Sequence, residues 1–162
     1  MIPTLLLALF SPYLLGQNFP LTRLWCCSCG PFDMARIAIV EDNEDTLEML
    51  KVILQNGDEV VGFSDPSVFV DEFRPIHFDL VILDIVMPGR DGLEVFADTR
   101  RKDRAVPIMA VTASTHPLTH DELLRAGFCA HFSKPIHDIE SFRKIVLGYA
   151  GARRKPLNRK SA

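Results

Sequence analysis

The sequence contains no run of apolar residues that reaches the length of a transmembrane helix, which needs about 20 in succession. The cysteine cluster Cys26, Cys27 and Cys29 is followed by no second cysteine pair, and by no histidine pair at the short separation that would complete a zinc-finger motif. There is also no internal repeat and no low-complexity segment. These absences argue against a membrane span, a structural zinc site and a repeat protein. What remains is the composition of a globular protein, with 48% hydrophobic and 24% charged residues in 162 positions, enough for one domain.

The first 33 residues lack the marks of a secretory signal peptide. No Lys or Arg precedes the apolar block from Leu5 to Leu15, and no small-x-small cleavage site follows it. The prolines at positions 3, 12 and 20 would interrupt any long helix around the apolar block. Met34 begins a segment typical of the start of a compact domain. We therefore expect residues 1–33 to be a disordered extension, with a membrane-targeting or regulatory leader as the alternative.

Basic residues are scarce in the central part of the chain. Residues 34–150 hold 12 basic and 20 acidic side chains, a net charge of −8, whereas residues 151–162 carry five basic side chains and no acidic one. An acidic domain is a poor nucleic-acid binder, so no nucleic-acid partner is expected. We interpret residues 152–162 as a solvated basic tail, with membrane or nucleic-acid contact as the less favoured alternative. Nothing in the cysteine content requires an oxidising compartment, and we expect a cytoplasmic protein.

From residue 36 onward, short apolar runs alternate with amphipathic segments. Continuous apolar runs are typical of strands buried on both faces, and apolar residues three and four positions apart are typical of helices. Five such units predict an α/β fold, a doubly wound five-stranded parallel sheet of the flavodoxin-like kind, over residues 34–151. The expected strands are 37–40, 59–63, 78–84, 107–113 and 128–133, and the expected helices are 43–57, 65–74, 93–101, 116–127 and 137–151.

The polar residues that could perform chemistry stand where the predicted strands end. A parallel sheet of this type builds its ligand site at the carboxyl edge of the strands, so these side chains are expected to converge. Carboxylates held together repel one another, and a hard cation such as Mg²⁺ relieves that repulsion. A hydroxyl and an ammonium group can hold phosphoryl oxygens opposite the metal. The residues are Glu41, Asp42, Asp84, Thr112 and Lys134.

Four motifs in this order and spacing resemble the receiver domain of two-component response regulators, of the stand-alone chemotaxis or phosphorelay type. The resemblance covers residues 35–150, and the joint pattern is far more specific than any one motif. The motifs read IAIVEDNEDT, VILDIVMPGRDG, AVTAS and FSKPI.

The resemblance implies definite roles for the acidic residues. Asp84 would be the phosphoacceptor, which attacks a phosphohistidine on a partner protein. Asp42 and Asp84 would bind Mg²⁺ directly, together with the backbone carbonyl of Val86. Glu41 would act on the metal through water.

The resemblance also assigns the opposite side of the site. Thr112 would move toward a phosphoryl oxygen, the small Ala113 would give its loop room to move, and Lys134 would pair with the phosphoryl group. The bond between Lys134 and Pro135 is expected to be cis, as Lys-Pro is in the family. Pro88 and Gly92 would shape the turn after the acceptor.

One position departs from the family pattern. His131 stands where receivers usually carry Tyr or Phe, so it is a possible switch residue, and a half-buried strand histidine without a switch role is the equal alternative. The remaining histidines of this half, His116, His120 and His137, are expected to be exposed, and their spacing indicates no metal site.

We therefore interpret the chain as a phosphoacceptor signalling switch that works with a histidine kinase or a histidine phosphotransfer protein and a downstream protein target. It is expected not to be an enzyme, beyond catalysing its own phosphorylation and dephosphorylation. Few residues follow the last predicted helix, too few for an output module, which favours signalling by protein contact or onward phosphotransfer.

Three alternatives remain. An aspartate-nucleophile phosphatase on a similar fold would carry a second Asp two residues after the first, where this chain has Val86. A flavin mononucleotide carrier would need a phosphate-binding loop after the first strand, where this chain has the acidic run EDNED. A degenerate receiver that only docks to partners is the third possibility.

Overall fold

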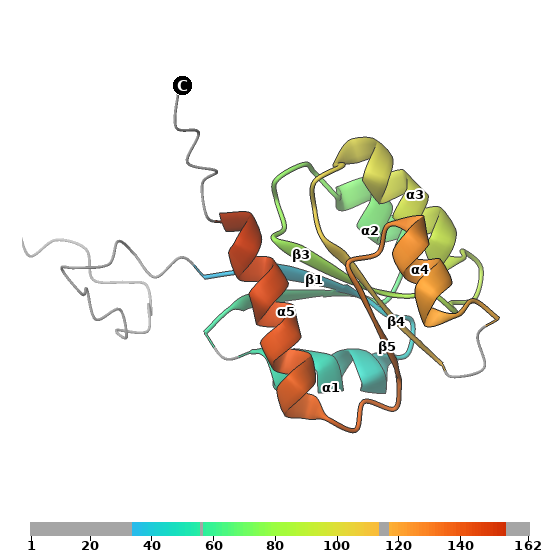
Figure 1. The fold of residues 1–162 in the computed structure, drawn as a ribbon. Helices are drawn as coiled ribbons and strands as arrows, with labels where there is room; N and C mark the ends of the chain where they lie inside the picture. Colours follow the sequence, from blue (N-terminus) through green and yellow to red (C-terminus); the bar gives the residue numbers. More distant parts are fainter. Residues whose placement is uncertain (1–33, 56, 114–116, 155–162) are drawn as a thin grey trace, which may run out of the picture. The chain divides into compact units, whose positions relative to one another are not determined.

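A computed structural model describes residues 34–55, 57–113 and 117–154 of the chain (Figure 1). The predicted extension 1–33 and residues 155–162 of the predicted tail lie outside the described residues. The predicted α/β architecture is confirmed, with strands and helices in strict alternation. The elements are β1 (Arg36–Val40), α1 (Glu44–Leu54), β2 (Glu59–Phe63), α2 (Pro66–Glu72), β3 (Leu80–Asp84), α3 (Gly92–Lys102), β4 (Ile108–Ala113), α4 (His120–Ala126), β5 (Ala130–Lys134) and α5 (Ile139–Arg154).

The five described strands form one parallel sheet in the order β2-β1-β3-β4-β5. The order reverses at β1, because β2 lies on one side of it and β3 to β5 follow on the other. In open parallel sheets such a reversal marks the crevice where ligands bind, beyond the carboxyl ends of the strands. The topology therefore points to the ends of β1 and β3 as the place of a site.

Helices cover both faces of the sheet, as Figure 1 shows. One face carries α1 and α5, which contribute Leu50, Leu54 and Phe142 to the core. The other face carries α2, α3 and α4 over a core that includes the fully buried Phe69. Burial of one such large apolar side chain contributes about 1.5–3 kcal/mol to folding. No helix among the described residues is both long and apolar enough to cross a membrane.

The helices begin at side chains that cap their free N–H groups. Asn43 accepts a hydrogen bond from the backbone N–H of Thr46 (2.8 Å) at the start of α1. At the start of α4, Thr119 and Glu122 form a capping box, in which each side chain accepts from the other residue's backbone N–H. The predicted helix 116–127 therefore begins later than expected, at His120.

Most other boundaries differ from the sequence prediction by one to three residues, as at β5, α5 and α1. The strand expected at 128–133 lies at Ala130–Lys134, because the backbone N–H of Phe128 still donates to Leu123 of α4. The last helix continues to Arg154, three residues beyond the predicted end at 151. The shorter helix α1 ends at Leu54 rather than at 57.

A buried carboxylate, Asp103, joins three segments at the amino-terminal edge of β4. It accepts hydrogen bonds from the backbone N–H of Ile76 (3.1 Å), the backbone N–H of Ala105 (2.9 Å) and the guanidinium of Arg153 on α5 (2.5 Å). Burial alone would raise the pKa of Asp103, but these donors outweigh it and lower the pKa from 3.8 to about 2. The charged carboxylate therefore stabilises the packing of α5.

We expect Asp103→Asn to destabilise the protein at pH 5 by about 2 kcal/mol and to have little effect near pH 2. Because the folded-state pKa is depressed, the stabilisation is fully present above the ordinary pKa near 4 and is lost as the pH falls through about 2. Urea unfolding of the two proteins at several pH values measures this difference. A gap between them that stays constant down to pH 2 would contradict the assignment.

Candidate functional site

The strand register brings the predicted site residues to one edge of the sheet. Asp84 ends β3 and pairs with Val111 of β4, so that Thr112 lies one residue further along the same edge. Lys134 ends β5 and pairs with Ala113. Glu41 and Asp42 directly follow β1, which lies beside β3. The convergence that the sequence predicted is therefore present.

Three carboxylates form the centre of this edge. Glu41 is 2% exposed and Asp84 is 5% exposed, whereas Asp42 is half-buried. One oxygen from each of them can be chosen so that all three lie within 4.8 Å of one another. Oxygen ligands at this mutual distance suit a hard divalent cation, and a cation offsets the repulsion between buried negative charges. The donor set therefore fits Mg²⁺, and the oxygens belong to Glu41, Asp42 and Asp84.

The ammonium group of Lys134 lies against two of these carboxylates. Its Nζ donates to Asp84 Oδ2 at 2.5 Å and also to Glu41 Oε2. Burial alone would lower the pKa of Lys134, but the hydrogen bonds to Asp84 and Glu41 outweigh it and raise the pKa. Burial also raises the pKa of Glu41, and Lys134 opposes that shift. The lysine is thus charged, and it compensates part of the negative charge of the cluster.

The sequence predicted Lys134 as a phosphoryl ligand but gave no sign of its pairing with Glu41. The two residues are 93 positions apart in the sequence. They meet because β1 and β5 are parallel strands of one sheet, with β3 and β4 between them. The predicted cis bond between Lys134 and Pro135 is confirmed.

The hydroxyl group of Thr112 is buried at the same edge of the sheet as the three carboxylates. Thr112 is 2% exposed, and its Oγ1 has no hydrogen-bond partner within the part of the chain that the structure describes. A buried polar atom without a partner costs about 1–3 kcal/mol, so such a group is often one that binds a ligand. Ala113, the next residue, is half-buried at the end of β4.

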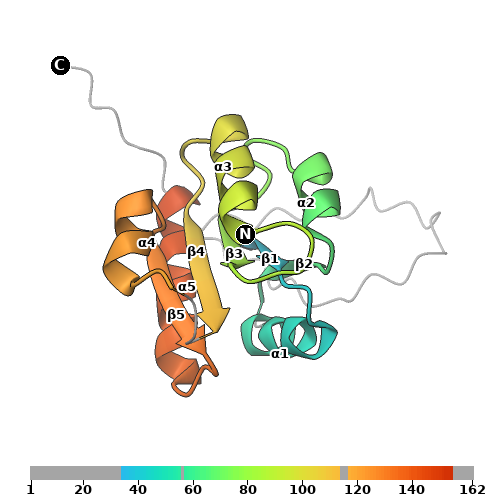
Figure 2. The ribbon, with the colours of Figure 1, turned by 90° about the vertical axis from the view of Figure 1, so that its right-hand side faces the viewer.

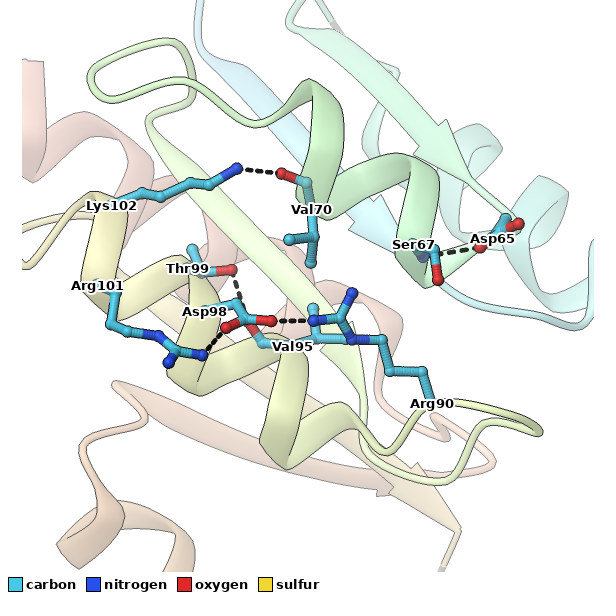
Figure 3. A network of polar contacts seen from close by, with 9 residues as sticks. All are labelled: Asp65, Ser67, Val70, Arg90, Val95, Asp98, Thr99, Arg101 and Lys102. Atoms are coloured by element: carbon cyan, nitrogen blue, oxygen red, sulfur yellow. Dashed lines mark hydrogen bonds and ion pairs between the residues drawn. The ribbon is translucent and has the colours of Figure 1, made fainter.

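The loop after Asp84 is held close to the carboxylate. The backbone N–H of Val86 donates to Asp84 Oδ1 (3.0 Å), while the Val86 side chain is 52% exposed. The role of the Val86 carbonyl as a metal ligand stays a prediction. Further along the loop, Arg90 pairs with Asp98 of α3, which also pairs with Arg101 (Figure 3). The loop is thereby fastened to the helix that follows it.

Figure 3 also shows how α3 is fixed to its surroundings. Lys102 donates to the backbone carbonyl of Val70 at α2, and the buried Thr99 hydroxyl donates to the carbonyl of Val95 at 2.8 Å. On α2, the Asp65 side chain caps the helix by accepting from the backbone N–H of Ser67 at 2.7 Å. The contact of Lys102 with Val70 therefore joins α3 to α2, and the other two hydrogen bonds lie within one helix each.

Gly92 permits the close return of this loop. Its N–H donates to the carbonyl of Ile85 (3.1 Å), and an added Cβ would lie 2.2 Å from the backbone oxygen of Asp84 and 2.7 Å from the Cα of Ile85. Both contacts are with backbone atoms, which cannot rotate away. The predicted role of Gly92 in shaping this turn has its physical reason in these two contacts. Pro88, the other residue of the predicted turn, is exposed in the same loop.

We expect Gly92→Ala to destabilise the protein by about 2–3 kcal/mol, because the backbone must shift to admit the methyl group. Gly148→Ala is the matched control. It lies inside α5 with nothing within 4 Å of the added Cβ, and it should stabilise the protein by about 0.5–1 kcal/mol. Chemical denaturation of the two variants measures both effects, and equal changes in the two would show that the clash at Gly92 is absent.

His131 lies apart from the carboxylates. It is half-buried on β5, and its side chain faces His120 at the start of α4, with 3.4 Å between the two Nδ1 atoms. His120 and His137 are exposed, as expected, whereas His116 lies outside the described residues. The sequence did not indicate the contact between His120 and His131. The proposed switch role of His131 stays a prediction.

Comparison with known proteins gives the same family along most of the chain. A family model described as "Response regulator receiver domain" matches residues 37–146. The chain is 35% identical over 112 residues to the uncharacterized transcriptional regulatory protein YrkP of Bacillus subtilis, a match over 68% of this chain and 48% of that protein. It is 31% identical over 122 residues to the sensor protein GacS of Pseudomonas syringae, over 72% of this chain and 13% of GacS. The chain thus spans about half or less of these curated relatives.

A solved structure shares the fold at similar coverage. The receiver domain of sensor histidine kinase PA1611 from Pseudomonas aeruginosa is 25% identical, with a TM-score of 0.62 over 73% of this chain and 98% of that one. That structure has a magnesium ion coordinated in its active-site cleft.

Proposed function

The chain belongs to the response regulator receiver domain family, and on that premise we propose that it accepts a phosphoryl group on Asp84. The observation that supports this most is the setting of Asp84, a buried carboxylate between two other carboxylates and one ammonium group. Each oxygen of Asp84 has a donor, since Val86 donates to Oδ1 and Lys134 to Oδ2. These two hydrogen bonds orient the carboxylate for attack.

In the proposed reaction, an oxygen of Asp84 attacks the phosphorus of a phosphohistidine on the partner protein. A phosphorus–oxygen bond forms, the phosphorus–nitrogen bond breaks, and the histidine leaves as an imidazole that takes up a proton. Asp42, Asp84 and the Val86 carbonyl would hold a Mg²⁺ ion directly and Glu41 would hold it through water, and the ion would neutralise the charge of the incoming phosphoryl group.

The residues on the β4 and β5 side have complementary roles in this proposal. The ammonium of Lys134 moves from the unphosphorylated carboxylate to a phosphoryl oxygen, which carries the larger negative charge. The Thr112 hydroxyl, which has no partner among the described residues, donates to a second oxygen. Ala113 leaves room for that movement, and Pro135 directs Lys134 into the site.

The partners that we propose are a histidine kinase or a histidine phosphotransfer protein as donor and a downstream protein as target. The chain catalyses its own phosphorylation and dephosphorylation only. We also propose the cytoplasm as its location. The phosphatase alternative is less well supported, because the position two residues after Asp84 carries the exposed apolar side chain of Val86.

The proposal predicts that the purified protein gains one phosphoryl group from a small donor such as acetyl phosphate when Mg²⁺ is present. Chelation of the metal with EDTA should reduce this incorporation by about 100-fold or more, because a metal that stabilises phosphoryl charge contributes several kcal/mol. Intact-mass spectrometry over time measures the gain. Equal incorporation with and without the metal would contradict the proposed role of the carboxylate cluster.

A further inference from the structure

Two imidazole rings face each other at the edge strand of the sheet, away from the carboxylate cluster. His120 is the first residue of α4, and His131 lies on β5. Their Nδ1 atoms are 3.4 Å apart, their ring centroids are 5.6 Å apart, and the rings are tilted by 42°. Figure 2 shows α4 and α5 on either side of β5 at this edge.

Both histidines stand on elements whose positions are fixed. The capping box of Thr119 and Glu122 holds the first turn of α4, where His120 lies. His131 pairs with Ala110 in the ladder between β4 and β5. Ligands on regular elements keep their geometry better than ligands on loops, so the distance between the two rings is a stable property of the fold.

The distance between the nitrogens suits a shared metal ion better than a direct hydrogen bond. At 3.4 Å the contact is longer than a strong hydrogen bond, for which about 2.7–3.2 Å is usual. Two nitrogens that each lie 2.0–2.1 Å from a tetrahedral zinc ion are about 3.3–3.4 Å apart. Imidazole nitrogen is also a preferred ligand of Zn²⁺ and related transition metals, whereas Mg²⁺ prefers oxygen.

Both rings line a groove between α4, β5 and α5 whose other lining residues are mainly apolar, and His120 is exposed to solvent. Cys129 lines the same groove, but burial raises the pKa of its thiol to about 11, so it stays protonated and is a weak ligand at neutral pH. Among the described residues, the protein therefore offers two imidazole nitrogens here, and water would fill coordination positions that they leave.

We propose that His120 and His131 form a two-histidine site for a zinc-class divalent cation, distinct from the carboxylate cluster at the other strand ends. The metal joins the start of α4 to β5. Because it binds the folded protein and not the separated elements, it raises the thermal stability, and the rise continues as the free metal concentration increases above the dissociation constant.

Zinc titration by calorimetry of the full chain tests this proposal. Cys26, Cys27 and Cys29 are replaced by serine to remove their thiols, and excess Mg²⁺ is present to compete at the carboxylate cluster. The parent for all histidine variants is this chain with the three serines. The control variant, His137→Ala, removes an exposed histidine that lies outside the pair. We expect His120→Ala and His131→Ala each to bind one zinc ion fewer per chain than His137→Ala, and to lose the zinc-dependent rise in melting temperature.

His120→Ala changes an exposed side chain at a helix start, so it should fold even if His131→Ala does not; circular dichroism checks both. The same zinc stoichiometry in His120→Ala and His137→Ala would overturn the proposal, as would a parent protein that binds no zinc. The zinc proposal and the phosphorylation proposal can fail separately, because the histidine pair and the carboxylate cluster share no residue.

Discussion

Asp84→Asn should abolish phosphoryl incorporation from acetyl phosphate in the presence of Mg²⁺. The amide has the size of the carboxylate and can still accept hydrogen bonds, but it has no anionic oxygen to attack phosphorus and no negative charge for the metal. Intact-mass spectrometry should detect no phosphorylated species on the timescale on which the wild-type protein is fully modified.

Asp91→Asn is the matched control for this substitution. Asp91 lies seven residues further along the chain and caps α3 by accepting from the backbone N–H of Leu93 at 2.9 Å. Asparagine caps a helix about as well as aspartate, so this variant should fold and be phosphorylated like the wild type. Equal loss in the two variants would point to damage of the loop, and retained labelling in Asp84→Asn would contradict the assignment of the acceptor.

Lys134→Ala should slow phosphoryl incorporation by about 100-fold or more. Removal of one preplaced donor to a developing negative charge typically costs a factor of 10²–10³. The same substitution removes the ammonium that now occupies Asp84 Oδ2 and Glu41 Oε2. Affinity for Mg²⁺ should therefore stay equal or increase, since the metal no longer competes with an internal cation for these oxygens.

The prediction is specific because phosphoryl incorporation should fall while the affinity for Mg²⁺ does not. A general loss of structure would lower metal affinity and phosphorylation together. Calorimetric titration with Mg²⁺ and a phosphorylation time course on the same sample distinguish the two cases. Lys144→Ala, at an exposed position of α5, is the control and should change neither property. If Lys134→Ala incorporates phosphoryl groups at the wild-type rate, the lysine has no role in the reaction and contributes only to stability.

Most of the fold could be predicted because buried parallel strands are continuous apolar runs. Strand β2 lies where the sequence predicted it, at Glu59–Phe63. Some element boundaries were predicted wrongly because an apolar residue can belong to either of two neighbouring elements. Phe128 is buried and apolar but closes the end of α4, because its N–H donates to Leu123. Val68 is apolar and lies within the predicted helix 65–74, but its side chain is 45% exposed.

The site could be predicted as a set of residues but not as a set of contacts. The rule that parallel strands end at one edge brings Glu41, Asp84 and Lys134 together without any coordinates. The pairing of Lys134 with Glu41 depends on the length and direction of a side chain from β5, which no sequence spacing encodes. The same holds for His120 and His131, whose contact exists only because α4 packs on β5 with this rotation.

The position of the phosphoryl group is the most direct test of the central claim. The wild-type protein is phosphorylated with acetyl phosphate and Mg²⁺, reduced with borohydride to convert an aspartyl phosphate into homoserine, and digested for tandem mass spectrometry. We expect homoserine at position 84 and at no other aspartate. Modification at Asp42, or a phosphoryl group on a histidine with Asp84 unchanged, would contradict the account.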